Sequence, residues 1–155
     1  MRILGEDGIG KILKRFLQIC LIGGIIFLVS VPFWIEKTGL QLIETSIIIY
    51  PNGITLLGIV YEFIGLFDSL KNNNPFCEKN VKKLRNAGNI SIISAMFWAI
   101  DLVLAIFLSS TSKVILISVF AFMIILFVGV SIALYILSEL IRQGAEYKEE
   151  NELTI

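Results

Sequence analysis

Four long apolar runs dominate the sequence, and nearly all charged residues lie outside them. The runs cover residues 16–35, 46–67, 88–108 and 114–137, and the shortest of them has 20 residues. Because an α-helix rises about 1.5 Å per residue, each run is long enough to cross the roughly 30 Å hydrocarbon core of a bilayer. The pattern predicts an all-α fold, a single membrane domain built as a bundle of four transmembrane helices.

The composition points to the same class of protein. Hydrophobic residues make up 56% of the 155 positions and charged residues 17%, against about 25% charged residues in soluble domains. The first run is too long for the apolar core of a signal peptide, and no small-residue cleavage site follows it, so we expect it to stay in the mature chain. The sequence contains no histidine, which removes the commonest general base and the commonest metal ligand.

The distribution of Lys and Arg predicts how the helices are oriented. Eleven of the thirteen basic residues lie before residue 16, between residues 68 and 87, or after residue 137. Only Lys37 and Lys113 lie in the other two connections. Because basic residues favour the cytoplasmic side, we expect both chain ends, the connection 68–87 and the tail 138–155 in the cytoplasm. The strong bias also argues against a dual-topology dimer.

The connection 68–87 contains a predicted amphipathic helix before the third span. Asn74 is the expected N-cap and Pro75 the first helical residue. At 100° per residue the apolar side holds Cys77, Val81, Leu84 and Gly88, and the opposite arc holds Lys79, Lys82, Lys83 and Arg85. This helix either lies in the headgroup region or runs straight into the third span. The basic residues are candidate contacts for anionic lipid or a partner, or act only as topology determinants.

The tail continues the fourth span as a predicted helical extension. Opposite charges recur at helical spacing in the pairs Glu139 and Arg142, Arg142 and Glu146, and Lys148 and Glu152. Residues 139–155 hold five acidic and two basic side chains, whereas residues 68–86 hold two acidic and five basic ones. The two segments therefore attract each other, or each meets a partner, or the tail is simply solvated. Acidic candidates for partner contact are Glu146, Glu149 and Glu150.

Two carboxylates interrupt the apolar runs and are candidates for function. Glu62 lies in the second run and Asp101 in the third, where an Asp at mid-helix costs about 2.5 to 3.5 kcal/mol on insertion scales. Glu62 shares a helical stripe with small or polar residues, and Ser94 lies on the stripe of Asp101. The different depths of the two carboxylates predict that they do not touch, with no Lys or Arg deep enough to neutralise either.

We therefore expect Asp101 to be protonated or hydrated. The polar candidates Glu62, Asp101 and Ser94 either form a proton or ligand site or make hydrogen bonds that fix the helix register. In the fourth run Gly129 and Ala133 form a small-xxx-small pair. This pair packs within one chain or between the chains of a homo-oligomer.

Other motifs do not point to chemistry. Residues 5–11 match most of a phosphate-binding loop, but Ile12 occupies the position that needs Ser or Thr for magnesium. Cys20 lies in a span and Cys77 in the cytoplasmic connection, so we expect neither a disulfide nor a zinc site. The sequence thus predicts no catalytic residues, no metal and no cofactor, and a protein that is not an enzyme.

Two segments resemble a family of bacterial membrane proteins, domain of unknown function 2975. The first segment contains Asn74, Pro75, Phe76, Glu78, Asn80, Leu84, Arg85 and Gly88; the second contains Glu139, Arg142, Gly144 and residues 148–155. The resemblance covers nearly the whole chain. It implies four spans in the bacterial plasma membrane, and members often accompany a small cytoplasmic helix-turn-helix regulator.

Three functions are compatible with these features. The first is a sensor or sequestering regulator that acts on a cytoplasmic helix-turn-helix partner without binding nucleic acid itself. The second is a small proton-linked transporter or channel subunit that uses Glu62 and Asp101. The third is an immunity protein that protects the membrane from a peptide toxin.

Overall fold

The predicted all-α fold is confirmed by a computed structural model, which describes residues 9–38, 42–71, 77–108 and 113–152. These residues form four helices: α1 (Ile9–Thr38), α2 (Leu42–Lys71), α3 (Glu78–Leu108) and α4 (Lys113–Glu152). Each helix contains one of the four predicted apolar runs. Helices α1, α2 and α4 extend beyond both ends of their runs, whereas α3 extends only beyond the start of its run. The predicted connection 68–87 is thus largely helical, because α2 continues to Lys71 and α3 is already formed at Glu78.

In the described residues α3 begins at Glu78, directly after Cys77. The carbonyl of Cys77 accepts hydrogen bonds from the backbone amides of Asn80 (2.9 Å) and Val81 (3.3 Å), so it closes the first turn of the helix. The predicted N-cap Asn74 and the following Pro75 lie outside the described residues. The basic candidates Lys79, Lys82, Lys83 and Arg85 lie on α3, the same continuous helix that carries Asp101.

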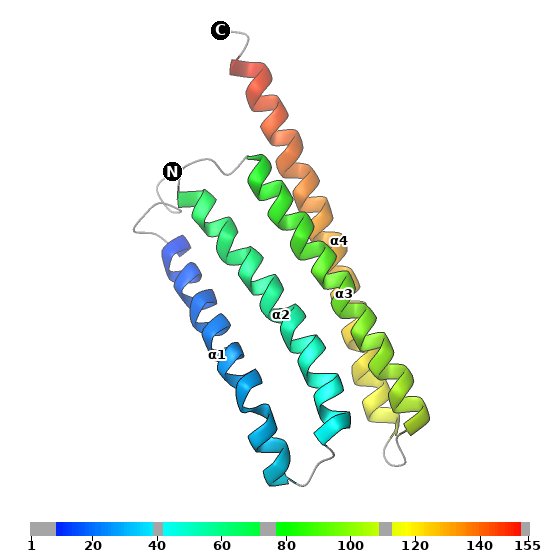
Figure 1. Cartoon of the computed structure of the whole chain (residues 1–155). Helices are drawn as coiled ribbons and strands as arrows, with labels where there is room; N and C mark the ends of the chain where they lie inside the picture. The colour runs from blue at the N-terminus through cyan, green and yellow to red at the C-terminus, as the bar shows by residue number, and fades with distance from the viewer. Residues whose placement is uncertain (1–8, 39–41, 72–76, 109–112, 153–155) are drawn as a thin grey trace.

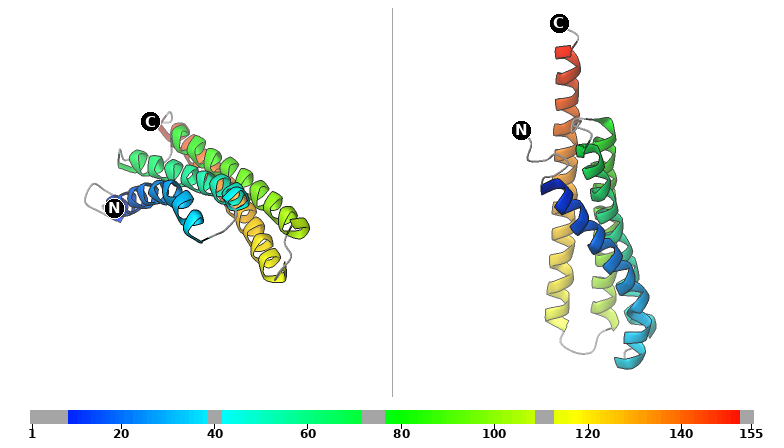
Figure 2. Two further views of the ribbon diagram at one scale, coloured as in Figure 1. Left: turned by 60° about the horizontal axis from the view of Figure 1, so that its bottom comes forward. Right: turned by 90° about the vertical axis from the view of Figure 1, so that its left-hand side faces the viewer.

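The four helices run alternately up and down, and α1 begins at the same end of the molecule at which α4 ends (Figure 1). Backbones approach within 8 Å only between consecutive helices, namely α1 with α2, α2 with α3, and α3 with α4, in the part of the chain that is described. Figures 1 and 2 show α1 at one edge and the α3–α4 pair at the other. The arrangement is an open row, because α1 does not close the bundle against α4.

Reciprocal glycine contacts join α1 to α2. A Cβ atom on Gly24 of α1 would lie 2.5 Å from Leu57 Cδ2 of α2, and a Cβ atom on Gly53 of α2 would lie 2.5 Å from Leu28 Cδ2 of α1. Each leucine thus occupies the space left by the glycine of the opposite helix. This close packing attaches α1 to α2 alone, and much of its remaining surface is exposed.

The buried core lies between the other three helices. Leu84 and Ala87 of α3 pack with Leu134 of α4, and partly buried residues surround them. These surrounding residues are Phe63 and Leu66 of α2 and Ile141 of α4. Side chains from α2 and α4 therefore pack against the same buried cluster, two of whose three residues belong to α3.

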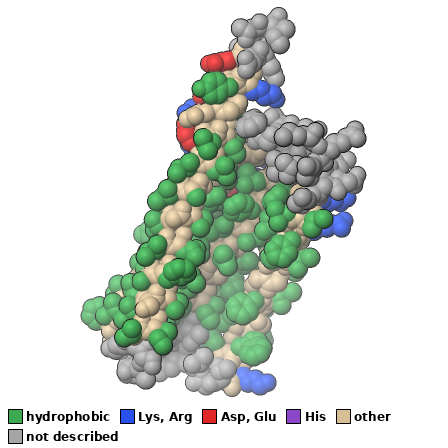
Figure 3. Space-filling view, turned by 180° about the vertical axis from the view of Figure 1, so that it is seen from behind, with side chains coloured by type: hydrophobic (Ala, Val, Ile, Leu, Met, Phe, Trp, Pro, Cys, Tyr) green, Lys and Arg blue, Asp and Glu red, His purple; other side chains and the backbone are tan. Residues whose placement is uncertain are grey.

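The outer surface of the helices is apolar. All four helices are long and apolar enough to cross a membrane. Large hydrophobic side chains such as Phe27 (60%), Phe107 (81%) and Ile125 (71%) are exposed. On the face shown in Figure 3, hydrophobic side chains cover the body of the molecule and the visible charged side chains lie mainly toward its two ends. Lipid is the solvent that such a surface requires, and the molecule is a multi-pass membrane protein.

The small-residue pair of the fourth run lies on the exposed side of α4. Gly129 and Ala133 are both exposed, and a Cβ atom on Gly129 would meet nothing within 4 Å. Of the two packing alternatives for this pair, the described helices do not use the one within the chain. Assembly into a homo-oligomer stays a prediction.

Candidate functional site

The two intramembrane carboxylates have separate partners, as predicted from their different depths. Glu62 of α2 accepts hydrogen bonds from two side chains of α3, Lys83 Nζ at 3.1 Å and Asn86 Nδ2 at 3.2 Å. The Lys83 ammonium also lies 5.7 Å from the centre of the Tyr61 ring. The side chains of Glu62 and Lys83 are 14% and 21% exposed, so this ion pair is largely shielded from solvent.

Two predictions about Lys83 were wrong. The sequence pattern put Lys83 on an outward basic arc, and it left Glu62 without a cation. In the structure α3 runs beside α2 from Glu78 onward, which brings Lys83 next to Glu62. Gly65 leaves the room for this approach, because a Cβ atom there would collide with the end of the Lys83 side chain. The other basic candidates, Lys79, Lys82 and Arg85, are exposed.

Asp101 is more deeply buried than Glu62 and has a neutral partner. Its side chain accepts a 2.6 Å hydrogen bond from Asn52 Nδ2 of α2. Asp101 is 3% exposed and Asn52 is 9% exposed. The second hydrogen of Asn52 Nδ2 is directed to the backbone carbonyl of Ile48 at 2.9 Å, one turn back on α2.

Other polar groups lie on the inner side of α3. Ser94, the third polar candidate, is fully buried, and its hydroxyl has no hydrogen-bond partner among the described residues. The indole N–H of Trp98, one turn further along, also has no partner, although the Trp98 ring packs against Phe120 of α4 with 5.5 Å between centroids. Buried serines of this protein otherwise bond backbone carbonyls, as Ser91 does with Ala87 at 2.9 Å.

Asn52 and Asn86 are the partners that sequence reasoning missed. A signal for Asn52 was present, because an amide inside an apolar run must find a hydrogen bond there. Asn52 also lies three residues before Thr55, on an extension of the Glu62 stripe. Asn86 gave a weaker signal, since it lies in the basic segment before the third apolar run.

Polar contacts join α3 to α4 near the end where the chain terminates. Ser131 Oγ donates to the carbonyl of Gly88 at 2.9 Å, and Tyr135 Oη donates to Asn89 Oδ1. One turn beyond Tyr135, Glu139 Oε2 lies 3.5 Å from Arg85 Nη2. This ion pair is one contact of the kind expected from the opposite net charges of the connection and the tail.

The tail is helical as far as it is described. The predicted ion pairs of Arg142 with Glu139 and with Glu146 are both present, each at 2.5 Å. Of the remaining acidic candidates, Glu150 is exposed, whereas the side chain of Glu149 lies outside the described residues. The predicted pair of Lys148 with Glu152 also falls outside them, because the Glu152 side chain is not described.

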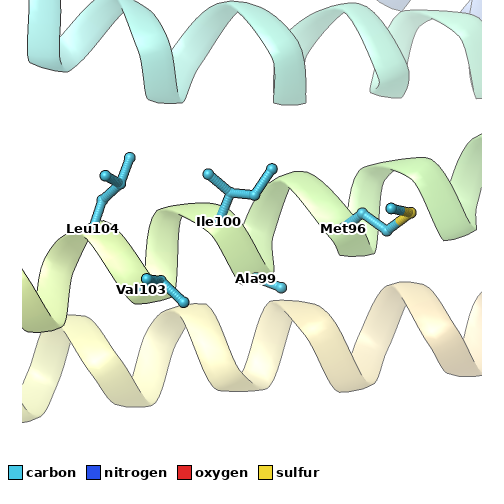
Figure 4. A pocket seen from close by; sticks show the side chains of 5 residues that line it. All are labelled: Met96, Ala99, Ile100, Val103 and Leu104. Carbon is cyan, nitrogen blue, oxygen red and sulfur yellow. The ribbon is translucent and has the colours of Figure 1, made fainter.

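One apolar groove of about 400 Å³ lies along α3. It is lined by Met96, Ala99, Ile100, Val103 and Leu104. Figure 4 shows these side chains on the part of α3 that runs between α2 and α4. The groove has no polar side chain in its lining and is separate from the Asp101 pair.

The other sequence candidates are dispersed. Cys20 is exposed on α1 and Cys77 is partly buried before α3, both as free thiols. The described ranges contain no group of three or more Cys, Asp or Glu side chains placed to hold a metal ion. Most of the loop-like motif at residues 5–11 precedes the first described residue.

Comparison with known proteins identifies the family. No curated protein and no solved structure matches the chain significantly. One family model, described as a protein of unknown function (DUF2975), matches residues 14–155. This match includes all of α2, α3 and α4 and most of α1. Both carboxylate pairs and the α4 extension, the part of α4 after its apolar run (residues 138–152), therefore lie within it. The chain therefore belongs to the DUF2975 family.

Proposed function

We propose that this protein is a non-enzymatic regulator of the bacterial plasma membrane that binds a soluble helix-turn-helix protein through the C-terminal part of α4. The observation that carries the proposal is the length of this helix. The 40 residues of α4 span about 60 Å, and the segment after its apolar run, residues 138–152, accounts for about 22 Å of that length. Figure 1 shows this segment running past the ends of the other helices.

The base of the α4 extension is fixed to α3, which gives it a defined direction. Ile141 packs against the core of Leu84, Ala87 and Leu134, and Glu139 pairs with Arg85. Arg142 then links Glu139 to Glu146 along the helix. A helix held in this way loses less conformational entropy on binding than a disordered tail, so it favours recognition of a partner.

The exposed surface of the extension supports a protein partner. Leu140 and Tyr147 lie seven residues apart and are 58% and 67% exposed, on a helix that also carries Glu146 and Glu150. Apolar anchors at this spacing are typical of a helix that lies in a groove of its partner. The acidic residues match the basic surface of a DNA-binding protein and compete with phosphate for it.

The orientation is part of the same proposal. With eleven of thirteen basic residues on one side, both chain ends and the α4 extension face the cytoplasm. This side is where a helix-turn-helix protein, the companion implied by the family resemblance, is found. Reporter fusions after Lys37 and after Lys148 test the orientation, and cytoplasmic activity from the first fusion contradicts it.

The binding test uses full-length protein in nanodiscs and the purified helix-turn-helix companion. We expect Tyr147→Ala and Glu146→Lys each to weaken binding about tenfold, which corresponds to about 1.4 kcal/mol. The matched control is Ile125→Ala, an equally exposed apolar residue in the membrane part of α4. No binding by the wild type, or equal binding by wild type and Tyr147→Ala, refutes docking at the extension.

The transporter alternative has one observation in its favour, the buried pair of Asp101 and Asn52. An Asp101→Asn variant that loses ion flux in liposomes while it stays folded supports that alternative. No feature of the described residues favours a toxin-immunity role.

A further inference from the structure

Asp101 lies in a part of the molecule where a negative charge has little to stabilise it. It is 3% exposed, and its side chain is hydrogen-bonded to the neutral amide of Asn52. The cation that pairs with Glu62 cannot serve both carboxylates. Lys83 precedes Asp101 by 18 residues on α3, which is about 27 Å along the helix.

The surrounding helices supply no opposite charge at this level among the described residues. On α2, the buried polar side chains at this level are Asn52 and, one turn further along, Thr55. The Thr55 hydroxyl donates to backbone carbonyls of its own helix. From α4, Phe120 packs against Trp98 beside Asp101. None of these side chains ionises, so Asp101 is the titratable group of this cluster.

The hydrogen-bonding capacity of Asn52 gives a second, independent observation. Both hydrogens of Asn52 Nδ2 have acceptors, Ile48 O at 2.9 Å and Asp101 Oδ2 at 2.6 Å, which fixes the orientation of the amide. Its Oδ1 atom is then a buried acceptor to which no side chain or backbone group of the described residues donates. A buried acceptor left unpaired costs about 1–3 kcal/mol. An ionised Asp101 accepts hydrogen bonds only, whereas a neutral carboxylic acid also donates one.

We propose that Asp101 is an intramembrane proton-binding site, in which the neutral carboxylic acid donates a hydrogen bond to Asn52 Oδ1 while Asn52 Nδ2 donates to Asp101 Oδ2. The proton comes from bulk water, and no other bond forms or breaks. With the proton bound, the acid and the amide each donate one hydrogen bond to the other and accept one from it. The contact between α2 and α3 at this depth is uncharged and depends on that proton. This site is independent of the partner proposed for the α4 extension.

Infrared spectroscopy of full-length protein in phosphatidylcholine nanodiscs tests the proposal. The chain has three aspartates, Asp7, Asp68 and Asp101, and the first two lie outside the predicted apolar runs. With heavy-carbon label on the aspartate carboxyl groups, we expect an isotope-shifted C=O band of a neutral carboxylic acid at neutral pH. It moves to lower frequency in heavy water. This wild-type measurement needs no variant to fold.

Variants then assign the band. Asp101→Asn abolishes it, whereas Glu62→Gln, the matched control, leaves it unchanged because Glu62 is held by Lys83. Asn52→Leu raises its frequency, because the acid loses its hydrogen-bond partner. A band that survives in Asp101→Asn assigns the proton elsewhere and refutes the proposal.

A bound cation is the alternative that the experiment separates. Carboxylate, amide and hydroxyl oxygens also suit a monovalent metal ion, so the spectra are recorded in sodium chloride and in N-methylglucamine chloride. We expect the same neutral-acid band in both. A band absent in both salts, or present only without sodium, overturns proton binding as the resting state of Asp101.

Discussion

Glu62 and Asp101 are acidic side chains on neighbouring helices, and they differ in the partners that accompany their burial. Glu62 lies where α3 brings Lys83 and Asn86 beside it, and its side chain keeps 14% exposure. Asp101 is 3% exposed and is paired with the amide of Asn52. An ion pair at partial burial retains both charges, whereas a deeply buried carboxyl with no cation beside it is stabilised best without its charge.

The two pairs also lie at different levels along the contact between α2 and α3. The Glu62 pair lies near the chain-terminus end of the α2–α3 contact, close to the core around Leu84. The Asp101 pair lies toward the opposite end, with the unpaired Ser94 hydroxyl and Trp98 indole on the same side of α3. Polar interactions thus join α2 to α3 at two separate levels, and each can be broken without the other.

The largest effect is expected from removing the partner of Asp101. Asn52→Leu leaves the buried carboxyl without its hydrogen bond, and we expect a loss of about 1–2 kcal/mol in the free energy of unfolding. The measurement is reversible unfolding in mixed micelles with increasing dodecyl sulfate.

The matched control for this change is Asn86→Leu. It removes the same amide donor from Glu62, but Glu62 retains Lys83, so we expect a loss of only a few tenths of a kcal/mol. Equal losses in the two variants show that the carboxylates do not differ in the way proposed.

A smaller effect is expected from Lys83→Met, which preserves the length of the side chain and removes its charge. Glu62 keeps Asn86 and partial hydration, so we expect a loss of about 1 kcal/mol. Because salt screens exposed and partly exposed charges, the loss shrinks as ionic strength rises. The unfolding of Asn52→Leu shows no such salt dependence if Asp101 is neutral, and a salt-dependent loss there contradicts the comparison.

The sequence was sufficient to predict the four helices because length and apolar composition decide that question. It was also sufficient for the pairs of Arg142 with Glu139 and Glu146, since partners three or four residues apart on one helix need no tertiary information. The confirmed features of the fold are of this local kind.

Contacts between helices could not be predicted in the same way. The angle of Lys83 on its own helix puts it beside Lys82, and only the position of α2 turns it toward Glu62. Likewise the open row depends on how Gly24 and Gly53 accept leucines of the facing helix, which an isolated helical pattern does not specify. Asn52 was overlooked for a related reason, since its partner Asp101 lies on another helix.

The smallest effect tests whether Gly65 provides the space that the ion pair needs. A methyl group at position 65 collides with the end of the Lys83 side chain, so Gly65→Ala moves the ammonium away from Glu62. The same change favours the helix intrinsically by up to about 1 kcal/mol, which masks the loss in a single variant. A double-mutant cycle removes this contribution, because it is common to the wild-type and Lys83→Met backgrounds. We expect Gly65→Ala to be less favourable in the wild type than in Lys83→Met by about 0.5 kcal/mol. If Gly65→Ala has the same effect in both backgrounds, the glycine does not act through Lys83, and the Glu62 pair forms without the space that distinguishes it from the Asp101 pair.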